Sequence, residues 1–178
     1  NLYPVFSENT YAHLGAGASL TQKGLFPNLK ASGILYANLT HSLVGGIGLR
    51  YQSFDIDDVF VYSTNLHWYV QDFLIMLQGF MQYRNETPLG TGVLTLRKYL
   101  TNPDYIFLKL AYGQSPQGLR FEEDVIDTFE SVFVSVGGDL QVSSTFRISA
   151  SVEYRHNTFS SVTSRNRYGF SIGFSYQF

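Results

Sequence analysis

The sequence contains no cysteine among its 178 residues. This absence excludes disulfide frameworks, thiol nucleophiles and cysteine metal sites, but it leaves the redox compartment open. No stretch approaches about 18 consecutive apolar residues, so a transmembrane helix is also excluded. Charged residues make up only 15% of the chain, with a formal net charge of −2. This balance argues against nucleic acid as a partner and against a disordered chain.

Aromatic residues and glycine are plentiful, with 13 Tyr, 15 Phe and 16 Gly against one Trp and two Met. The composition does not change along the chain, so residues 1–178 are predicted to form a single domain. The mean hydropathy of −0.04 suits a soluble protein, but it equally suits a barrel that alternates lipid-facing and lumen-facing residues. The sequence starts at Asn1 and has no basic stretch followed by an apolar one, so we expect a signal peptide to have been removed.

Alternation with period 2 is clearest at the C-terminal end. Between Arg167 and Phe178 every second residue is aromatic or aliphatic, and the residues between them are polar or glycine. Segments 131–142 and 146–155 divide in the same way. A helix does not keep this period, so the pattern predicts strands. Further strands, which bring the total to about ten, are predicted near 10–20, 28–39, 43–54, 59–70, 73–84, 91–100 and 104–114.

The predicted connections alternate in length. Those near 20–27, 55–58, 85–90, 115–127 and 157–165 are longer, whereas those near 40–42, 71–72, 101–103 and 143–145 are short. Long extracellular loops and short periplasmic turns are typical of outer-membrane barrels, which have an even number of strands. The sequence therefore predicts an all-β fold, an antiparallel transmembrane β-barrel of about ten strands in the bacterial outer membrane, with both termini periplasmic.

A soluble β-sandwich or lipocalin-like barrel would also show short strands with alternating faces. Three features favour the membrane barrel over it. Aromatic residues lie at both ends of the apolar stripes, the connections alternate in length, and the last strand ends on an aromatic residue.

Four short segments cover about the middle third of the chain: Gly48-Leu49-Arg50-Tyr51 with Phe54 and Asp58, Leu66-His67-Trp68-Tyr69, Leu96-Arg97-Lys98-Tyr99-Leu100, and Tyr112-Gly113-Gln114-Ser115-Pro116. Together they resemble the YaiO-type family of outer-membrane β-barrels. The resemblance implies the fold and the location, but no established reaction and no catalytic motif. Some members of that family carry helical repeats before the barrel and look linked to glycan export; the sequence has no such repeats, and a glycan-export-linked barrel is kept as an alternative. The C-terminal Tyr176 and Phe178 resemble the insertion signal that barrels present to their assembly machinery.

The non-apolar face of the predicted strands carries several charges, which we predict to form a polar network in the lumen. Unpaired charges inside a narrow barrel are costly, so they should pair with one another or meet water. A ten-stranded barrel is little wider than an eight-stranded one, whose interior side chains fill. We therefore predict a salt-bridged interior, in which Glu153 contacts at least one of Arg50, Arg97, Arg155 or Arg167, and a structural or accessory role. A narrow small-solute pore with excess positive charge is the alternative. The network comprises Lys30, Arg50, His67, Arg97, Lys109, Asp139, Glu153, Arg155 and Arg167.

A rim-site hydrolase acting on lipid A or peptides is a second alternative, because Asp55, Asp57, Asp58 and His156 are predicted near the extracellular rim, with Ser160 and Ser161 beside the histidine. Hydrolysis needs a base within hydrogen-bond reach of the attacking group. By alternation His156 shares the lipid-facing side of its strand, where a polar residue at the membrane interface gives the same pattern. The chain is therefore predicted not to be an enzyme.

Neither His67 nor His13, which is expected on the inward face, has a metal-ligand spacing with another histidine or a carboxylate. No metal or cofactor is predicted. The expected partners are outer-membrane lipid and the barrel assembly machinery, with another outer-membrane protein as a further candidate.

Overall fold

The computed structural model describes residues 1–19, 27–54, 58–84, 87–101, 103–114, 130–158 and 164–176. Its strands form one sheet in which every strand pairs antiparallel with its neighbours in the sequence. No helix among these residues is long and apolar enough to cross a membrane. The strands are β1 (Val5–Ser7), β2 (Thr10–Ala18), β3 (Leu29–Asn38), β4 (Leu43–Ser53), β5 (Asp58–Val70), β6 (Phe73–Arg84), β7 (Thr87–Thr101), β8 (Asp104–Gly113), β9 (Glu130–Gln141), β10 (Phe146–Thr158) and β11 (Ser164–Tyr176).

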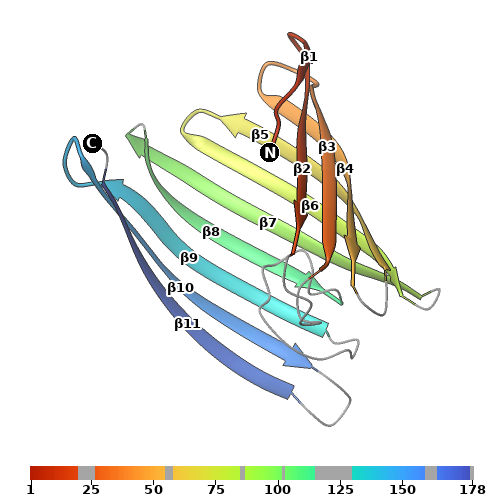
Figure 1. Cartoon of the computed structure of the whole chain (residues 1–178). Coiled ribbons are helices and arrows are strands. Elements are labelled where there is room, and N and C mark those ends of the chain that lie inside the picture. Colours follow the sequence, from red (N-terminus) through yellow and green to blue (C-terminus); the bar gives the residue numbers. More distant parts are fainter. Residues whose placement is uncertain are drawn as a thin grey trace.

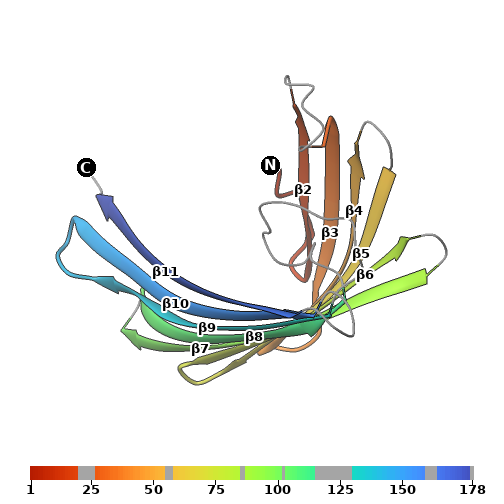
Figure 2. The same cartoon turned by 90° about the horizontal axis from the view of Figure 1, so that it is seen from below.

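The prediction of about ten antiparallel strands is confirmed by β2–β11, and β1 is a short addition that the alternation did not indicate. The ten strands contain 9 to 15 residues, enough for a tilted strand to cross a membrane. The sheet bends into an open trough with β2 and β11 on its two sides (Figure 2). It runs from β1 to β11 without a pairing between these two edge strands.

Strand register divides the side chains between two faces. The polar face carries the odd-numbered residues of β2, β5 and β7–β11 and the even-numbered residues of β3, β4 and β6; the apolar face carries the others. Exposed hydrophobic residues crowd the apolar face, where Tyr168 and Phe170 are 79% and 68% exposed. The buried polar residues all lie on the polar face: Asn65, Gln82, Thr91, Thr95, Ser131, Ser135 and Asn157.

This distribution reverses that of a soluble protein, in which apolar side chains are buried and polar ones exposed. Side chains on the concave side of a bent sheet converge and cover one another, so the burial identifies the polar face as the concave one. A small apolar cluster of Val93, Ala111 and Phe133, packed against Phe80, lies in its centre. The apolar face is thus the convex surface of the trough.

The two ends of the sheet differ. The turns at 39–42, 71–72 and 142–145 lie at one end of the sheet together with the end of β11. The end of β8, the start of β9, the end of β10 and the start of β11 lie at the other end (Figure 1). One predicted long connection, at 85–90, is wrong: β7 already begins at Thr87 and pairs with Arg84 of β6. On its other side β7 has no neighbouring strand before Thr91, because β8 ends opposite that residue. Residues 87–90 therefore have a neighbouring strand on one side only, where Pro88 is tolerated.

Candidate functional site: the polar face

Strand register places all nine residues of the predicted polar network on the polar face. His67, Lys109 and Glu153 lie in one row across the sheet, joined through Met76, Thr95 and Ser135. The other six lie along the strands on either side of this row, at Lys30, Arg50, Arg97, Asp139, Arg155 and Arg167. Six of the nine residues are lysine or arginine, two are carboxylates, and one is His67.

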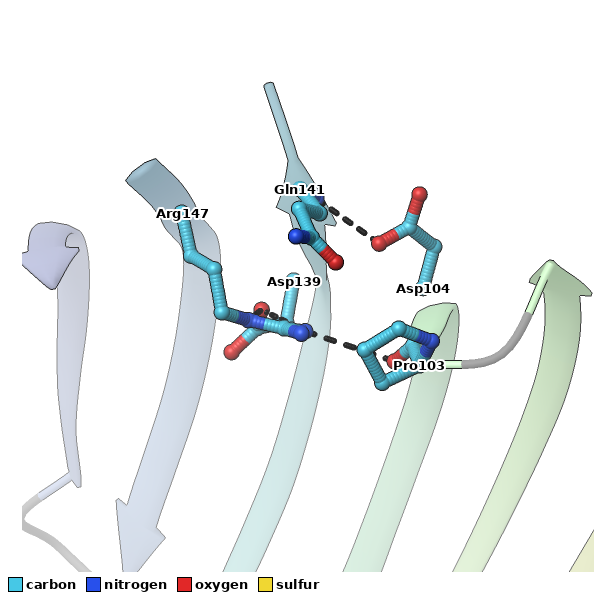
Figure 3. A network of polar contacts seen from close by, with 5 residues as sticks. All are labelled: Pro103, Asp104, Asp139, Gln141 and Arg147. Atoms are coloured by element: carbon cyan, nitrogen blue, oxygen red, sulfur yellow. Dashed lines mark hydrogen bonds and ion pairs between the residues drawn. The ribbon is translucent and has the colours of Figure 1, made fainter. Parts of the chain in front are cut away.

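A polar contact cluster forms at the short-turn end of the sheet (Figure 3). Arg147 of β10 donates from Nε to Oδ1 of Asp139 on β9 at 2.8 Å, and a terminal nitrogen of the same guanidinium bonds the same oxygen. That nitrogen also donates to the carbonyl of Pro103 at 3.3 Å. Asp104 accepts a hydrogen bond from the backbone N–H of Gln141 at 2.7 Å. These contacts join β9, β10 and the turn before β8.

Arg147 was not part of the predicted network, although it shares its odd-numbered position, and therefore the polar face, with Ser149 and Ser151. Its partner Asp139 lies opposite Ser149, so the two charged residues are diagonal neighbours. Asp139 therefore has a partner on the adjacent strand, and Glu153 is the other carboxylate of the predicted network.

Glu153 lies among cations. Lys109 pairs with Ser135, the residue opposite Glu153, and Arg155 follows two residues later on the same face of β10. The Glu153 side chain lies over Gly169 of β11, where an added Cβ would be 2.7 Å from Oε1. Arg155 and Arg167 lie directly opposite each other on β10 and β11. Two like charges in that position repel, and the Glu153 carboxylate lies on the same face of β10, two residues from Arg155.

Phe133 lies between two cations on the polar face. The Nζ of Lys109 is 5.9 Å from the centre of its ring, and the Cζ of Arg155 is 5.4 Å away. Cations at this distance are attracted to an aromatic ring when they lie over its face. The strand pattern hid Phe133, because it stands at a polar position between valines of the apolar face.

A series of aromatic residues on the polar face was also missed by sequence reasoning, which assigned aromatic residues to the lipid side. Tyr11 and Tyr36 stack with ring centres 5.1 Å apart, and Tyr36 lies 6.0 Å from His67. Further along the sheet, the guanidinium of Arg97 lies 4.1 Å from the ring centre of Tyr105. The sequence did contain the information, because an odd or even position within a strand fixes the face on which the side chain lies. The polar face is consequently lined by bulky side chains as well as by charges.

The proposed rim site is only partly described. His156 lies on the apolar face with Tyr154, and its Nδ1 is 2.6 Å from Oδ1 of Asn166. Its Nε2 is 3.4 Å from the hydroxyl of Thr158. Asp58 begins β5 and His156 lies on β10, so these two residues are on non-adjacent strands. Asp55, Asp57, Ser160 and Ser161 lie outside the described residues.

Two other expectations concern a metal and the C-terminal signal. Among the described residues no group of three metal-ligating side chains occurs, and the ring of His13 stacks on Tyr3 at 4.6 Å. Tyr176 pairs with Phe146 and is 59% exposed on the apolar face. Phe178 lies outside the described residues.

A continuous antiparallel sheet with an exposed apolar face and a buried polar face defines a membrane β-barrel domain. The family model of the YaiO membrane beta barrel domain matches residues 1–118, from β1 through β8. The chain belongs to this family, which confirms the resemblance seen in the sequence.

The chain is similar to solved structures of other proteins. An anion-selective porin from Comamonas acidovorans superposes with a TM-score of 0.62 at 11% identity; the match covers 99% of this chain and 58% of the porin. A bacterial polysaccharide outer membrane secretin superposes with a TM-score of 0.49 at 12% identity, over 95% of this chain and 70% of the secretin. No curated protein matches the sequence. At such low identity the likeness to the porin shows the fold alone.

Proposed function

We propose that the chain is an integral protein of the bacterial outer membrane in which β2–β11 close into a ten-stranded barrel. The observation that carries this proposal is the pair of faces: the apolar face would meet lipid, and the polar face would enclose the interior. Closure follows from the membrane, where the unpaired backbone groups of an open sheet edge are not tolerated. The end with the short turns would face the periplasm.

The interior would be filled by side chains, and the role would be structural or accessory. Two observations support a filled interior: the apolar cluster around Phe133, and the aromatic series that includes Tyr36 and Tyr105. A barrel of this size has little space beyond what such side chains occupy. The role would be non-enzymatic. In support, the ring nitrogens of His156 contact an amide and a hydroxyl rather than a carboxylate.

A narrow anion pathway is the second candidate, and the charge of the polar face favours it. Asp139 already pairs with Arg147, so Glu153 is the other acid among the six cations of the predicted network. The Nε atoms of Arg97 and Arg167 are buried without a hydrogen-bond partner. Such a surface attracts anions. The porin with the same fold is described as anion-selective.

The partners under this proposal are outer-membrane lipid around the apolar face and the assembly machinery that inserts the barrel. The C-terminal strand would present the insertion signal, since Tyr176 stands exposed at the end of β11. Another outer-membrane protein remains a candidate partner.

Planar-bilayer recordings and unfolding measurements on three variants distinguish a filled interior from an anion pathway. A filled interior predicts no current, and Glu153→Gln should then lower the free energy of unfolding by about 3 kcal/mol, because it leaves half-buried cations uncompensated. An anion pathway predicts anion current, reduced anion preference in Arg167→Gln and little change in the stability of Glu153→Gln. Lys98→Gln is the control for the loss of a positive charge, because Lys98 is exposed on the apolar face, outside the proposed interior. Clear anion current with unchanged stability of Glu153→Gln would reject the filled interior.

A further inference from the structure

The first seven residues, called segment 1–7 below, pair with the outer edge of β2, on the side away from β3. Leu2 and Leu14 exchange two backbone hydrogen bonds of 2.8 and 2.9 Å, and the N–H of Ala12 donates to the carbonyl of Pro4 at 2.9 Å. Val5 and Ser7 continue the pairing as β1. Ala12 is only 5% exposed although it lies on the apolar face. Segment 1–7 therefore uses the backbone groups on the side of β2 that points away from β3.

Strand direction decides which edges can join in a closed barrel. Successive strands alternate in direction from β1 to β11, so β1 and β11 are parallel, whereas β2 and β11 are antiparallel. An antiparallel barrel closes through an antiparallel pair and has an even number of strands. Closure through β2 gives ten strands, and closure through β1 would give eleven with a parallel junction. The edge that β11 requires is the one that segment 1–7 covers.

The two edge strands also match in length and position. Thr10 starts β2 and Tyr176 ends β11 at the end of the sheet that carries the short turns (Figure 1). An antiparallel junction that aligns these ends and keeps both faces places Leu14 opposite Ile172. Both side chains lie on the apolar face, 41% and 52% exposed. Because β2 has 9 residues and β1 has 3, pairing with β11 satisfies more of the β2 backbone.

We infer that segment 1–7 is a temporary occupant of the β2 edge, which β11 displaces when the barrel closes. This inference rests on the proposed membrane barrel. Before closure the segment covers an edge that would otherwise pair with other chains. On closure the hydrogen bonds from Ala12 and Leu14 pass from segment 1–7 to β11. The two pairings use the same backbone groups and exclude each other.

Engineered disulfides test the exchange without interference, because the chain has no cysteine. Leu2→Cys with Leu14→Cys reports the covered edge, since a pair that exchanges two backbone bonds has a Cα separation of about 5.5 Å, which suits a disulfide. Leu14→Cys with Ile172→Cys reports closure, and Phe170→Cys and Phe174→Cys in place of Ile172→Cys test the neighbouring registers. Ile148→Cys with Phe174→Cys is the matched control, because β10 and β11 pair there in both states. Each variant is refolded into liposomes and oxidised before or after insertion.

Before insertion we expect the 2–14 disulfide, and after insertion a disulfide from residue 14 to β11 at least tenfold in excess of the 2–14 product. Oxidising the 2–14 pair first should prevent formation of the folded barrel, which is recognised on gels by its different mobility in unheated samples. Reduction should restore the band of the folded barrel. The 148–174 disulfide should form in both states and leave insertion unchanged. An inserted protein that forms the 2–14 disulfide and not one from residue 14 to β11 would overturn the inference while the membrane barrel stands. Failure of the wild-type chain to insert would overturn the proposed function and this inference with it.

Discussion

The ion pair between Asp139 and Arg147 should stabilise the fold measurably, and Asp139→Asn tests it. The side chains are 27% and 19% exposed, so the pair is neither fully in solvent nor fully buried. Exposed pairs contribute about 0 to 1 kcal/mol, and breaking a buried one costs about 3 to 5 kcal/mol. Because an asparagine oxygen can still accept one hydrogen bond, we expect Asp139→Asn to cost about 1 to 2 kcal/mol.

A double-mutant cycle with Arg147→Gln isolates the contribution of the pair. Stability can be followed in urea through the single tryptophan, Trp68, which is 48% exposed on the apolar face. The coupling energy should be about 1 to 2 kcal/mol, since the guanidinium bonds one carboxylate oxygen twice. Asp72→Asn makes the same chemical change in the exposed β5–β6 turn and should have no effect beyond about 0.5 kcal/mol. A coupling energy as small as the effect of Asp72→Asn would refute this reasoning.

Three further predictions concern the lipid face, the packing of glycines and the topology. Phe170→Arg, in the middle of β11, should cost about 2 to 4 kcal/mol, whereas Ser171→Arg on the other face should act through packing; equal losses in liposome unfolding would contradict the faces. Gly113→Ala should cost about 1 to 3 kcal/mol, because its Cβ would lie 2.4 Å from backbone atoms of Gly90 and Thr91, while Gly92→Ala meets nothing within 4 Å and should be neutral. Protease added to intact cells should cleave within 115–127 and spare 143–145; cleavage confined to the short turns would reverse the orientation.

Local alternation was sufficient to predict much of the fold. In β11, Phe170 and Phe174 stand exposed on one face and Ser171 on the other, because the period of a strand is fixed by its own backbone. The start of β7 was not predictable in this way, since residues 87–90 are strand only because β6 extends far enough to pair with them. β1 was missed because its three residues are too few to show a period.

The polar face was predicted as a set of residues but not as a set of contacts. Alternation placed Asp139 and Glu153 on it, yet the choice of Arg147 as the partner of Asp139 depends on the β9–β10 register, which pairs Arg147 with Gln141. The tyrosines Tyr36 and Tyr105 were overlooked because aromatic residues serve both as lipid contacts and as interior filling. Whether an aromatic residue contacts lipid or fills the interior depends on the face that its position in the strand gives it.

The central claim is that the apolar face meets lipid while the polar face encloses the interior. Single cysteines at each position from 168 to 175, in a chain with no native cysteine, can carry a fluorescent label whose quenching by brominated lipid is measured in liposomes. The account predicts quenching that alternates with period 2, strong at Tyr168, Phe170, Ile172 and Phe174 and weak at Gly169, Ser171, Gly173 and Ser175. Quenching that is uniform along β11, or that is strong at the glycine and serine positions, would contradict it.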